Sequence, residues 1–175
     1  MSVRADPIEF AGKRVVVSGG TKGLGRATVE RFLKGGARVI TAARGNPEPI
    51  AGAEFVRADL TTAEGGEMLA TAALAHMGGV DILAHVIGGS SSPGGGFAAL
   101  TDDHWLAELN LNLLATVRLD PLLVPHMIVQ GAGRVCWRPI SRREGLAEAA
   151  RQQCARVAVV RCGRCRSRKL PFVQD

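Results

Sequence analysis

The chain has 175 residues, 46% of them hydrophobic and 22% charged, so it is long and apolar enough to bury a core as one domain. No apolar run approaches the roughly 20 residues of a membrane-spanning helix, and residues 1–10 lack the apolar segment of a secretory signal. We therefore expect a cytoplasmic protein with no membrane partner. The net charge of +6 is uneven, because residues 1–133 hold 11 Lys and Arg against 13 Asp and Glu, whereas residues 134–175 hold 11 against 3.

Residues 14–44 have the pattern of a strand, a glycine-rich turn, a helix and a second strand. The four segments are residues 15–17, 18–25, 26–34 and 38–42. Within about 30 residues, this order is the context that a dinucleotide-binding motif requires. Glycines let the backbone approach a ligand closely, and a helix that begins near Gly23 would direct its first N–H groups at a pyrophosphate. The predicted cofactor contacts here are Ser18, Gly19, Thr21, Lys22, Gly23, Leu24 and Gly25.

A second strand–helix unit follows this stretch. Residues 53–58 are expected to form a third strand that ends at Asp59 and Leu60. Thr61 is expected to cap the next helix, with Glu64 completing a capping box three residues later. Four glycines are expected to weaken or end this helix, namely Gly65, Gly66, Gly78 and Gly79.

The third unit begins with an apolar strand over residues 80–87. The loop that follows, residues 88–96, lies at the carboxyl end of that strand, where open parallel sheets bind ligands. Thr101 is expected to cap a long helix over residues 102–129, and residues 134–137 are expected to open a fifth strand. The apolar face of this helix is expected to lie in the core; it consists of Trp105, Leu106, Leu109, Leu113, Val117 and Leu119.

Two features of this part of the chain carry narrower expectations. Pro121 and Pro125 should bend or break the long helix, since each removes an internal hydrogen bond. Three histidines are expected to be packing or surface residues, since the sequence indicates no carboxylate or metal partner for them; they are His85, His104 and His126.

These elements together predict an α/β protein with a Rossmann-type, doubly wound parallel sheet of about five strands, incomplete because the last strands are missing. Residues 1–135 would form an NAD(P)-binding domain, and residues 136–175 a basic tail rich in Cys and Arg. Cys162 and Cys165 form a C-x-x-C pair without a second pair at zinc-site spacing, so no metal is expected. The arginines could bind phosphates, but few aromatic side chains accompany them, which does not favour a nucleic-acid partner.

Residues 13 to about 135 resemble the short-chain dehydrogenase/reductase family. Gly19, Gly23 and Gly25 match the three glycines of its turn, with Ser18 where Thr is usual. Further matches are Asp59-Leu60, the run 80–83, Gly88, and Asn112 seven residues after Trp105. The resemblance implies hydride transfer between a nicotinamide cofactor and a small carbonyl or alcohol substrate. It also implies that Asp59 contacts adenine, that Asn112 belongs to the catalytic set, and that the 102–129 helix builds a homo-oligomer.

The choice of cofactor follows from charge. An NAD site usually places Asp or Glu at the end of the second strand, where it binds the ribose hydroxyls. This chain has Arg44 there and Lys22 before Gly23, and a guanidinium suits a 2′-phosphate. The alternative is that both cations are solvated surface charges. We expect NADP(H) to be preferred over NAD(H).

The proton chemistry of the family is not supported by these residues. The family uses a tyrosine, a lysine four residues later and a serine, yet the chain contains no tyrosine. Ser141 stands one position late for the serine, and Lys169 has Cys165 four residues before it. The tail is therefore either an authentic divergent terminus or the product of a truncated or shifted reading frame. The chain is accordingly either an oxidoreductase that is catalytically defective or a non-catalytic NADP-binding protein or remnant.

Overall fold

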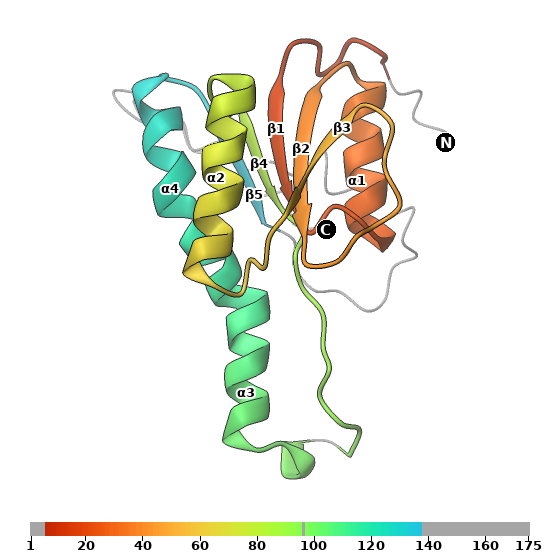
Figure 1. Ribbon diagram of the computed structural model, residues 1–175, viewed down its shortest axis with the longest axis vertical. Helices are drawn as coiled ribbons and strands as arrows, with labels where there is room; N and C mark the ends of the chain where they lie inside the picture. Colours follow the sequence, from red (N-terminus) through yellow and green to blue (C-terminus); the bar gives the residue numbers. More distant parts are fainter. Residues whose placement is uncertain (1–5, 96, 138–175) are drawn as a thin grey trace, which may run out of the picture.

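A five-stranded parallel sheet forms the centre of the molecule (Figure 1). The computed structural model of the chain describes residues 6–95 and 97–137. The strand order is β3-β2-β1-β4-β5, which is the order of a Rossmann sheet and confirms the predicted fold class. The strands are β1 (Arg14–Ser18), β2 (Arg38–Ala43), β3 (Ala53–Arg57), β4 (Ile82–His85) and β5 (Arg134–Trp137).

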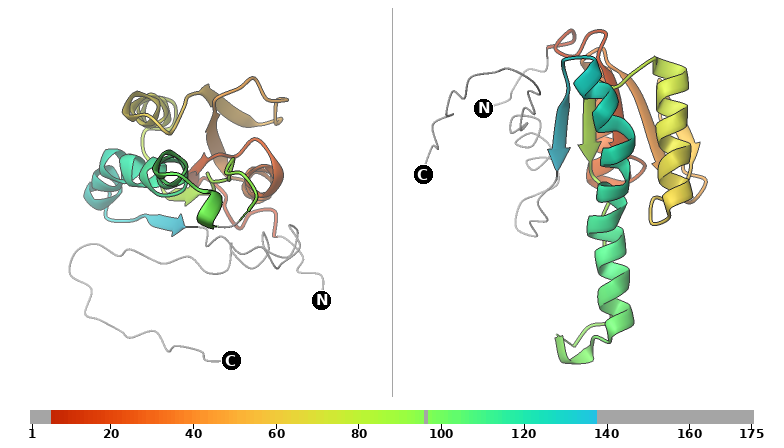
Figure 2. Two further views of the ribbon diagram at one scale, coloured as in Figure 1. Left: turned by 90° about the horizontal axis from the view of Figure 1, so that it is seen from below. Right: turned by 90° about the vertical axis from the view of Figure 1, so that its left-hand side faces the viewer.

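Helices cover both faces of the sheet, so that the domain has three layers (Figure 2). The helical segments are α1 (Gly23–Lys34), α2 (Ala63–Met77), the short 3₁₀ turn Phe97–Ala99, α3 (Asp102–Leu109), a π-helical turn (Asn110–Leu114) and α4 (Ala115–Val129). The central strand β1 is buried on both sides because its valines alternate between two cores. Val16 packs under α2 and α4, whereas Val15 and Val17 pack under α1.

The boundaries of α2 differ from the prediction. Thr62, not Thr61, is the N-cap, and its hydroxyl accepts a hydrogen bond from the Gly65 N–H at 3.1 Å. Thr61 instead donates to Asp59, so the expected capping box with Glu64 is wrong. Gly65 is required by the packing at the start of α2, because a Cβ there would lie 1.9 Å from the Asp59 carbonyl oxygen. Gly78 ends the helix in the left-handed conformation, as predicted.

The long helix is continuous from residue 102 to residue 129, and neither Pro121 nor Pro125 interrupts it. The expectation that its apolar face lies in the core is wrong for most of that face. Leu119 is fully buried, but Trp105 and Leu106 are 51% and 63% exposed. The exposed large apolar side chains of this helix also include Leu109, Leu113, Leu114 and Val117.

Length explains this exposure. A helix over residues 102–129 spans ~42 Å at 1.5 Å per residue, whereas strands of four to six residues span only ~13–20 Å. α4 therefore lies against the sheet while α3 projects past its carboxyl edge (Figures 1 and 2). Within the described residues, no helix has both the length and the apolar composition to cross a bilayer.

The amino edge of the sheet is held by a polar cluster on the side opposite α3. Asp81 receives hydrogen bonds from the Arg14 backbone N–H and guanidinium at 2.8–2.9 Å, and from the Gln130 amide at 2.8 Å. The Arg14 side-chain hydrogen bond is the main reason that the pKa of Asp81 falls to about 2. This cluster connects β1, the start of β4 and the end of α4.

Candidate cofactor site

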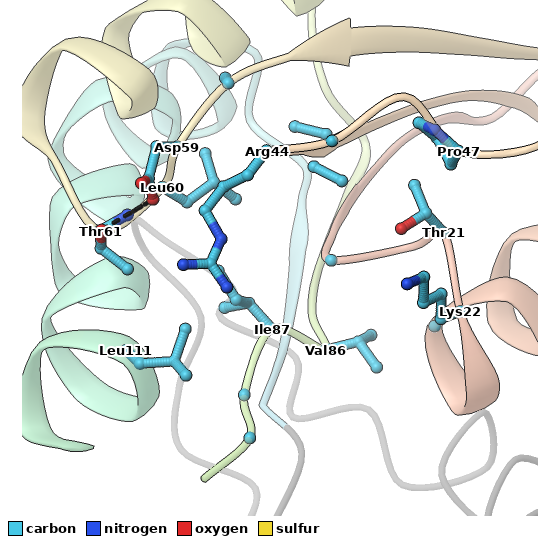
Figure 3. A pocket seen from close by; sticks show the side chains of 18 of the residues that line it. Thr21, Lys22, Arg44, Pro47, Asp59, Leu60, Thr61, Val86, Ile87 and Leu111 are labelled. Atoms are coloured by element: carbon cyan, nitrogen blue, oxygen red, sulfur yellow. Dashed lines mark hydrogen bonds between the residues drawn. The ribbon is translucent and has the colours of Figure 1, made fainter. Parts of the chain in front are cut away.

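A cavity of about 790 Å³ opens at the carboxyl edge of β1, β2 and β4 (Figure 3). Three groups of residues line it: the glycine turn before α1, the segments after β2 and β3, and the loop after β4 with part of the long helix. In Figure 3, Thr21 and Lys22 lie on one side of the cavity, Asp59 and Thr61 on the other, and Arg44 projects between them. The volume is within the range of small-molecule and cofactor sites.

The glycine turn is shaped by close backbone approach. A Cβ on Gly25 would lie 2.1 Å from the Gly19 carbonyl oxygen, so only glycine lets α1 begin against the turn. Gly19 has a φ of +75°, and its Cβ would lie 2.8 Å from the Ile87 Cα in the loop after β4. Two of the three glycines therefore satisfy packing requirements that a side chain would violate.

The N-terminus of α1 faces this cavity without a side-chain cap. Lys22 occupies the N-cap position in an extended conformation, and the first turn contains no acidic residue. Gly23, Leu24 and Gly25, the first residues of the helix, all line the cavity. Uncapped N–H groups and the positive end of the helix dipole favour an anion here, and the Lys22 ammonium adds to the positive potential.

Asp59 is fixed at the carboxyl end of β3. Its Oδ1 accepts hydrogen bonds from the Thr61 N–H at 3.0 Å and the Thr61 hydroxyl at 2.7 Å. Among the described residues, no hydrogen bond engages its second oxygen, which could accept one from a ligand. Burial alone would raise the pKa of Asp59, but the Thr61 hydrogen bonds and the charge of Arg44 outweigh it and hold the pKa below its ordinary value. Asp59 is thus a carboxylate acceptor beside a guanidinium.

The far wall is held by Asn112 and Glu108. The Asn112 amide donates to the Gly89 carbonyl at 2.9 Å and to a Glu108 carboxylate oxygen at 3.1 Å, and its Oδ1 accepts from the Gly89 N–H at 3.0 Å. Glu108 also accepts from the Ser92 hydroxyl at 2.8 Å and the Ser91 N–H at 3.2 Å. Hydrogen bonds from Ser90 and Ser92 lower the pKa of Glu108. Asn112 therefore anchors the loop after β4 to the long helix.

The structure gathers most of the predicted residues around one cavity. The predicted residues that line it are Gly19, Thr21, Lys22, Gly23, Leu24, Gly25, Arg44, Asp59, Leu60 and Gly88. Ser18 lies beneath the turn instead, where its buried hydroxyl accepts from the Val86 N–H at 3.3 Å. Asn112 acts behind the wall through Gly89. Ser141 and the C-x-x-C pair lie outside the described residues.

Sequence reasoning missed several residues of the site. Glu108 gave no signal, because a single carboxylate on a helix is usually a solvated surface charge. Ala107, Asn110 and Leu111 line the cavity from the long helix, which only the projection of α3 past the sheet reveals. Thr41 is a further residue that was missed: it is buried, and its hydroxyl contacts the glycine turn.

His85 is a packing residue, which is one of the two expected alternatives, and it has a carboxylate partner that the sequence did not indicate. His85, at the end of β4, is 3% exposed, and its Nε2 lies 2.9 Å from the Asp120 Oδ1 on α4. The partner stands 35 residues away, so no local sequence pattern could indicate the pair. His85 also packs edge-on against Trp137 at the end of β5.

The sheet order, the glycine turn and the cavity define a Rossmann-type domain. Residues 13–137, which are more than half of the chain, match the family model described as short chain dehydrogenase. The chain belongs to the short-chain dehydrogenase/reductase family, as the resemblance in its sequence predicted.

Similar proteins share this part of the chain. It is 30% identical over 132 residues to the protein named Probable galactose dehydrogenase GalD of Rhizobium meliloti (strain 1021), covering 69% of this chain and 51% of that protein. It is 30% identical over 129 residues to L-fucose dehydrogenase of Oryctolagus cuniculus, covering 70% and 45%. The ligand-free aldohexose dehydrogenase of Thermoplasma acidophilum has the same fold, with a TM-score of 0.68 and 19% identity over 85% of this chain and 58% of that one. The chain spans about half the length of the curated relatives it matches.

Proposed function

We propose that the chain is the cofactor-binding part of a short-chain dehydrogenase/reductase and that it binds NADP(H) in preference to NAD(H). One observation carries the proposal: Arg44 projects into the cavity that the glycine turn and Asp59 also line, and no carboxylate follows β2 in its place. A carboxylate in that position would bind ribose hydroxyls and repel a 2′-phosphate, whereas a guanidinium attracts it.

Different residues of the cavity would bind different parts of a dinucleotide. The N–H groups at the start of α1, together with Lys22, would hold the pyrophosphate. Asp59 would accept a hydrogen bond from the adenine amino group through its second oxygen, and Arg44 would hold the 2′-phosphate. The tight approaches at Gly19 and Gly25 support this fit, because a Cβ there would occupy space that the backbone itself needs beside the ligand.

The bound nicotinamide would supply hydride chemistry to a small carbonyl or alcohol substrate, as the family does. The chain has no tyrosine to carry the proton in that exchange, and other side chains replace a phenol poorly at neutral pH. We therefore propose that this chain is defective in turnover. The alternative is a non-catalytic NADP-binding protein or remnant, which would use the same cavity.

A titration of the full chain tests the proposed function. The intrinsic fluorescence of NADPH and of NADH is followed as protein is added, at one stated salt concentration. We expect NADPH to bind at least about tenfold more tightly, which corresponds to about 1.4 kcal/mol. Equal affinities would contradict the cofactor preference, and no binding of either would contradict the function as a whole. Oxidation of NADPH with a panel of aldehydes and ketones would contradict the proposed defect.

We also propose that the exposed apolar face of the long helix, from Trp105 to Val117, pairs with a second copy of the chain. Six large apolar side chains between Trp105 and Val117 are at least 40% exposed, and exposed apolar side chains gathered on one helix are typical of an interface. Sedimentation of the full chain at several concentrations should show a dimer. A chain that stays monomeric at tens of micromolar would contradict this proposal.

A further inference from the structure

Thr41 is a buried polar side chain on β2 that contacts the glycine turn without lining the cavity itself. Only 2% of the residue is exposed, and it lies on the face of the sheet toward α1, opposite Val17 in the β1–β2 register. Its hydroxyl donates to the Val17 carbonyl at 2.7 Å and accepts from the Gly20 N–H at 2.9 Å. One hydroxyl therefore connects the end of β1 with the beginning of the glycine turn.

Gly20 complements this hydroxyl. A Cβ on Gly20 would lie 2.4 Å from the Thr41 Oγ1 and 2.6 Å from the Val29 Cγ2 on α1. The Gly20 backbone is thus enclosed between β2 and α1, and it is close enough to hydrogen-bond Thr41 only because it lacks a side chain. The Thr41 hydroxyl and the missing Cβ of Gly20 form a matched pair.

The pair determines which part of the turn faces the cavity. Gly20 is buried and does not line the cavity, whereas the residues that follow it, Thr21 to Gly25, all do. Because the Gly20 N–H is bonded inward to Thr41, the N–H groups that remain for an anion are those of the next residues. Without the hydroxyl, a buried donor would lose its acceptor and the turn would shift to recover one.

We propose that Thr41 is a positioning residue of the cofactor site, which fixes the glycine turn in the conformation that directs the start of α1 at the pyrophosphate. This inference rests on the proposed function. The inference predicts a specific pattern of affinities. Both NADPH and NADH carry the pyrophosphate, so a substitution at Thr41 should weaken the binding of both cofactors equally. Arg44, in contrast, affects only the cofactor with the 2′-phosphate.

The test compares three variants of the full chain. Thr41→Val removes the hydroxyl at nearly constant shape, and Thr41→Ser keeps the hydroxyl. Thr116→Val is the matched control, because Thr116 is also buried and donates to the Leu113 carbonyl at 2.6 Å, but it does not line the cavity. We expect Thr41→Val to raise the Kd of NADPH and of NADH about tenfold each, with their ratio unchanged. Thr41→Ser and Thr116→Val should stay within about twofold of the wild type.

Two results would overturn the inference while the proposed function stands: a Thr41→Val chain that binds as tightly as the wild type, or a Thr41→Ser chain as weak as Thr41→Val. A wild-type chain that binds neither cofactor refutes both, and this is visible before any variant is made. Amide hydrogen exchange tests the hydrogen bond between Gly20 and Thr41 in the absence of any ligand. The Gly20 N–H should exchange more slowly than that of Lys22 in the wild type and lose this protection in Thr41→Val. An unprotected Gly20 in the wild type would also overturn the inference, even if Thr41→Val did not fold.

Discussion

The two walls of the cavity are built in different ways. In the wall formed by β1, the glycine turn and β2, backbone packs against backbone, because a Cβ on Gly25 would lie 2.1 Å from the Gly19 carbonyl oxygen. The Thr41 hydroxyl adds one buried hydrogen bond there, from the Gly20 N–H. The wall formed by the loop after β4 and the long helix is held by hydrogen bonds that the Asn112 amide makes and the Glu108 carboxylate accepts, which are exposed or only partly buried. The first wall is fixed by sterics and the second by a few polar contacts.

This difference indicates how the site depends on sequence. Substitutions at the glycines of the first wall place atoms where packed backbone already lies, so they should strongly reduce both the stability of the fold and the affinity for the cofactor. Substitutions in the second wall exchange protein hydrogen bonds for hydrogen bonds with water, which changes free energy little. We therefore expect the cofactor affinity to depend mainly on the first wall.

The largest effect is expected from Gly25→Ala. Its Cβ would meet the Gly19 carbonyl oxygen, so α1 must move away from the turn. We expect a loss of about 2–4 kcal/mol in the free energy of unfolding, measured by urea denaturation, and no detectable NADPH binding. Gly94→Ala is the control in the loop of the second wall, because its Cβ would meet no atom of residues 6–95 or 97–137 within 4 Å. Equal stability of the two variants would contradict the steric account of the first wall.

An intermediate effect is expected from Asp81→Asn, at the edge of the sheet opposite the cavity. The Arg14 hydrogen bond and charge lower the pKa of Asp81 to about 2 in the folded chain, whereas the pKa of an Asp carboxyl in an unfolded chain is about 4. The ionised form is thus favoured by folding, so its contribution is complete above about pH 4 and is lost as the pH falls through about 2. Since the pair is partly exposed, we expect a loss of about 1–2 kcal/mol at pH 7.

Urea denaturation of the wild type and of Asp81→Asn at neutral and acidic pH measures this contribution. The difference between the two chains should shrink as the pH falls from about 4 to about 2. NADPH affinity at pH 7 should be unchanged, because Asp81 lies far from the cavity along the strands. A difference in stability that is independent of pH would contradict the assigned role of the carboxylate.

The smallest effect is expected from Glu108→Gln in the second wall. The neutral amide keeps the shape but accepts more weakly from Ser92 and Asn112. We expect a Kd for NADPH about threefold higher and a melting temperature within about 2 °C of the wild type, measured by titration and thermal unfolding. A loss of binding as large as that of Gly25→Ala would show that the second wall matters as much as the first.

The sequence predicted the parts of the fold that depend on local pattern. The strand, glycine turn and helix around Gly19 and Gly25 follow from apolar periodicity and from glycine spacing, and so does the position of Arg44 after β2. The five strands and their parallel arrangement follow from the same pattern, because alternating strands and helices favour a parallel sheet.

The remaining features depend on distances between segments that no local pattern encodes. Thr41 reaches Gly20 from 21 residues away, which depends on the register of β1 and β2. His85 reaches Asp120 from 35 residues away, which depends on how α4 packs on the sheet. The apolar face at Trp105 has the periodicity of a core helix. It is exposed because the helix is longer than the strands, so its first part extends past the sheet. The N-cap of α2 is Thr62 and not Thr61, because the Thr61 hydroxyl donates a hydrogen bond to Asp59.

The central claim is that Arg44 makes this cavity an NADP site, and Arg44→Ala tests it most directly. Arg38→Ala is the matched control, because Arg38 begins the same strand and donates to the His76 carbonyl at 2.6 Å, away from the cavity. We expect Arg44→Ala to raise the Kd of NADPH about 10- to 100-fold, or about 1.4–2.7 kcal/mol, with the Kd of NADH within about twofold. Arg38→Ala should change neither affinity. An NADPH affinity that survives in Arg44→Ala, or an equal loss for both cofactors, would contradict the claim.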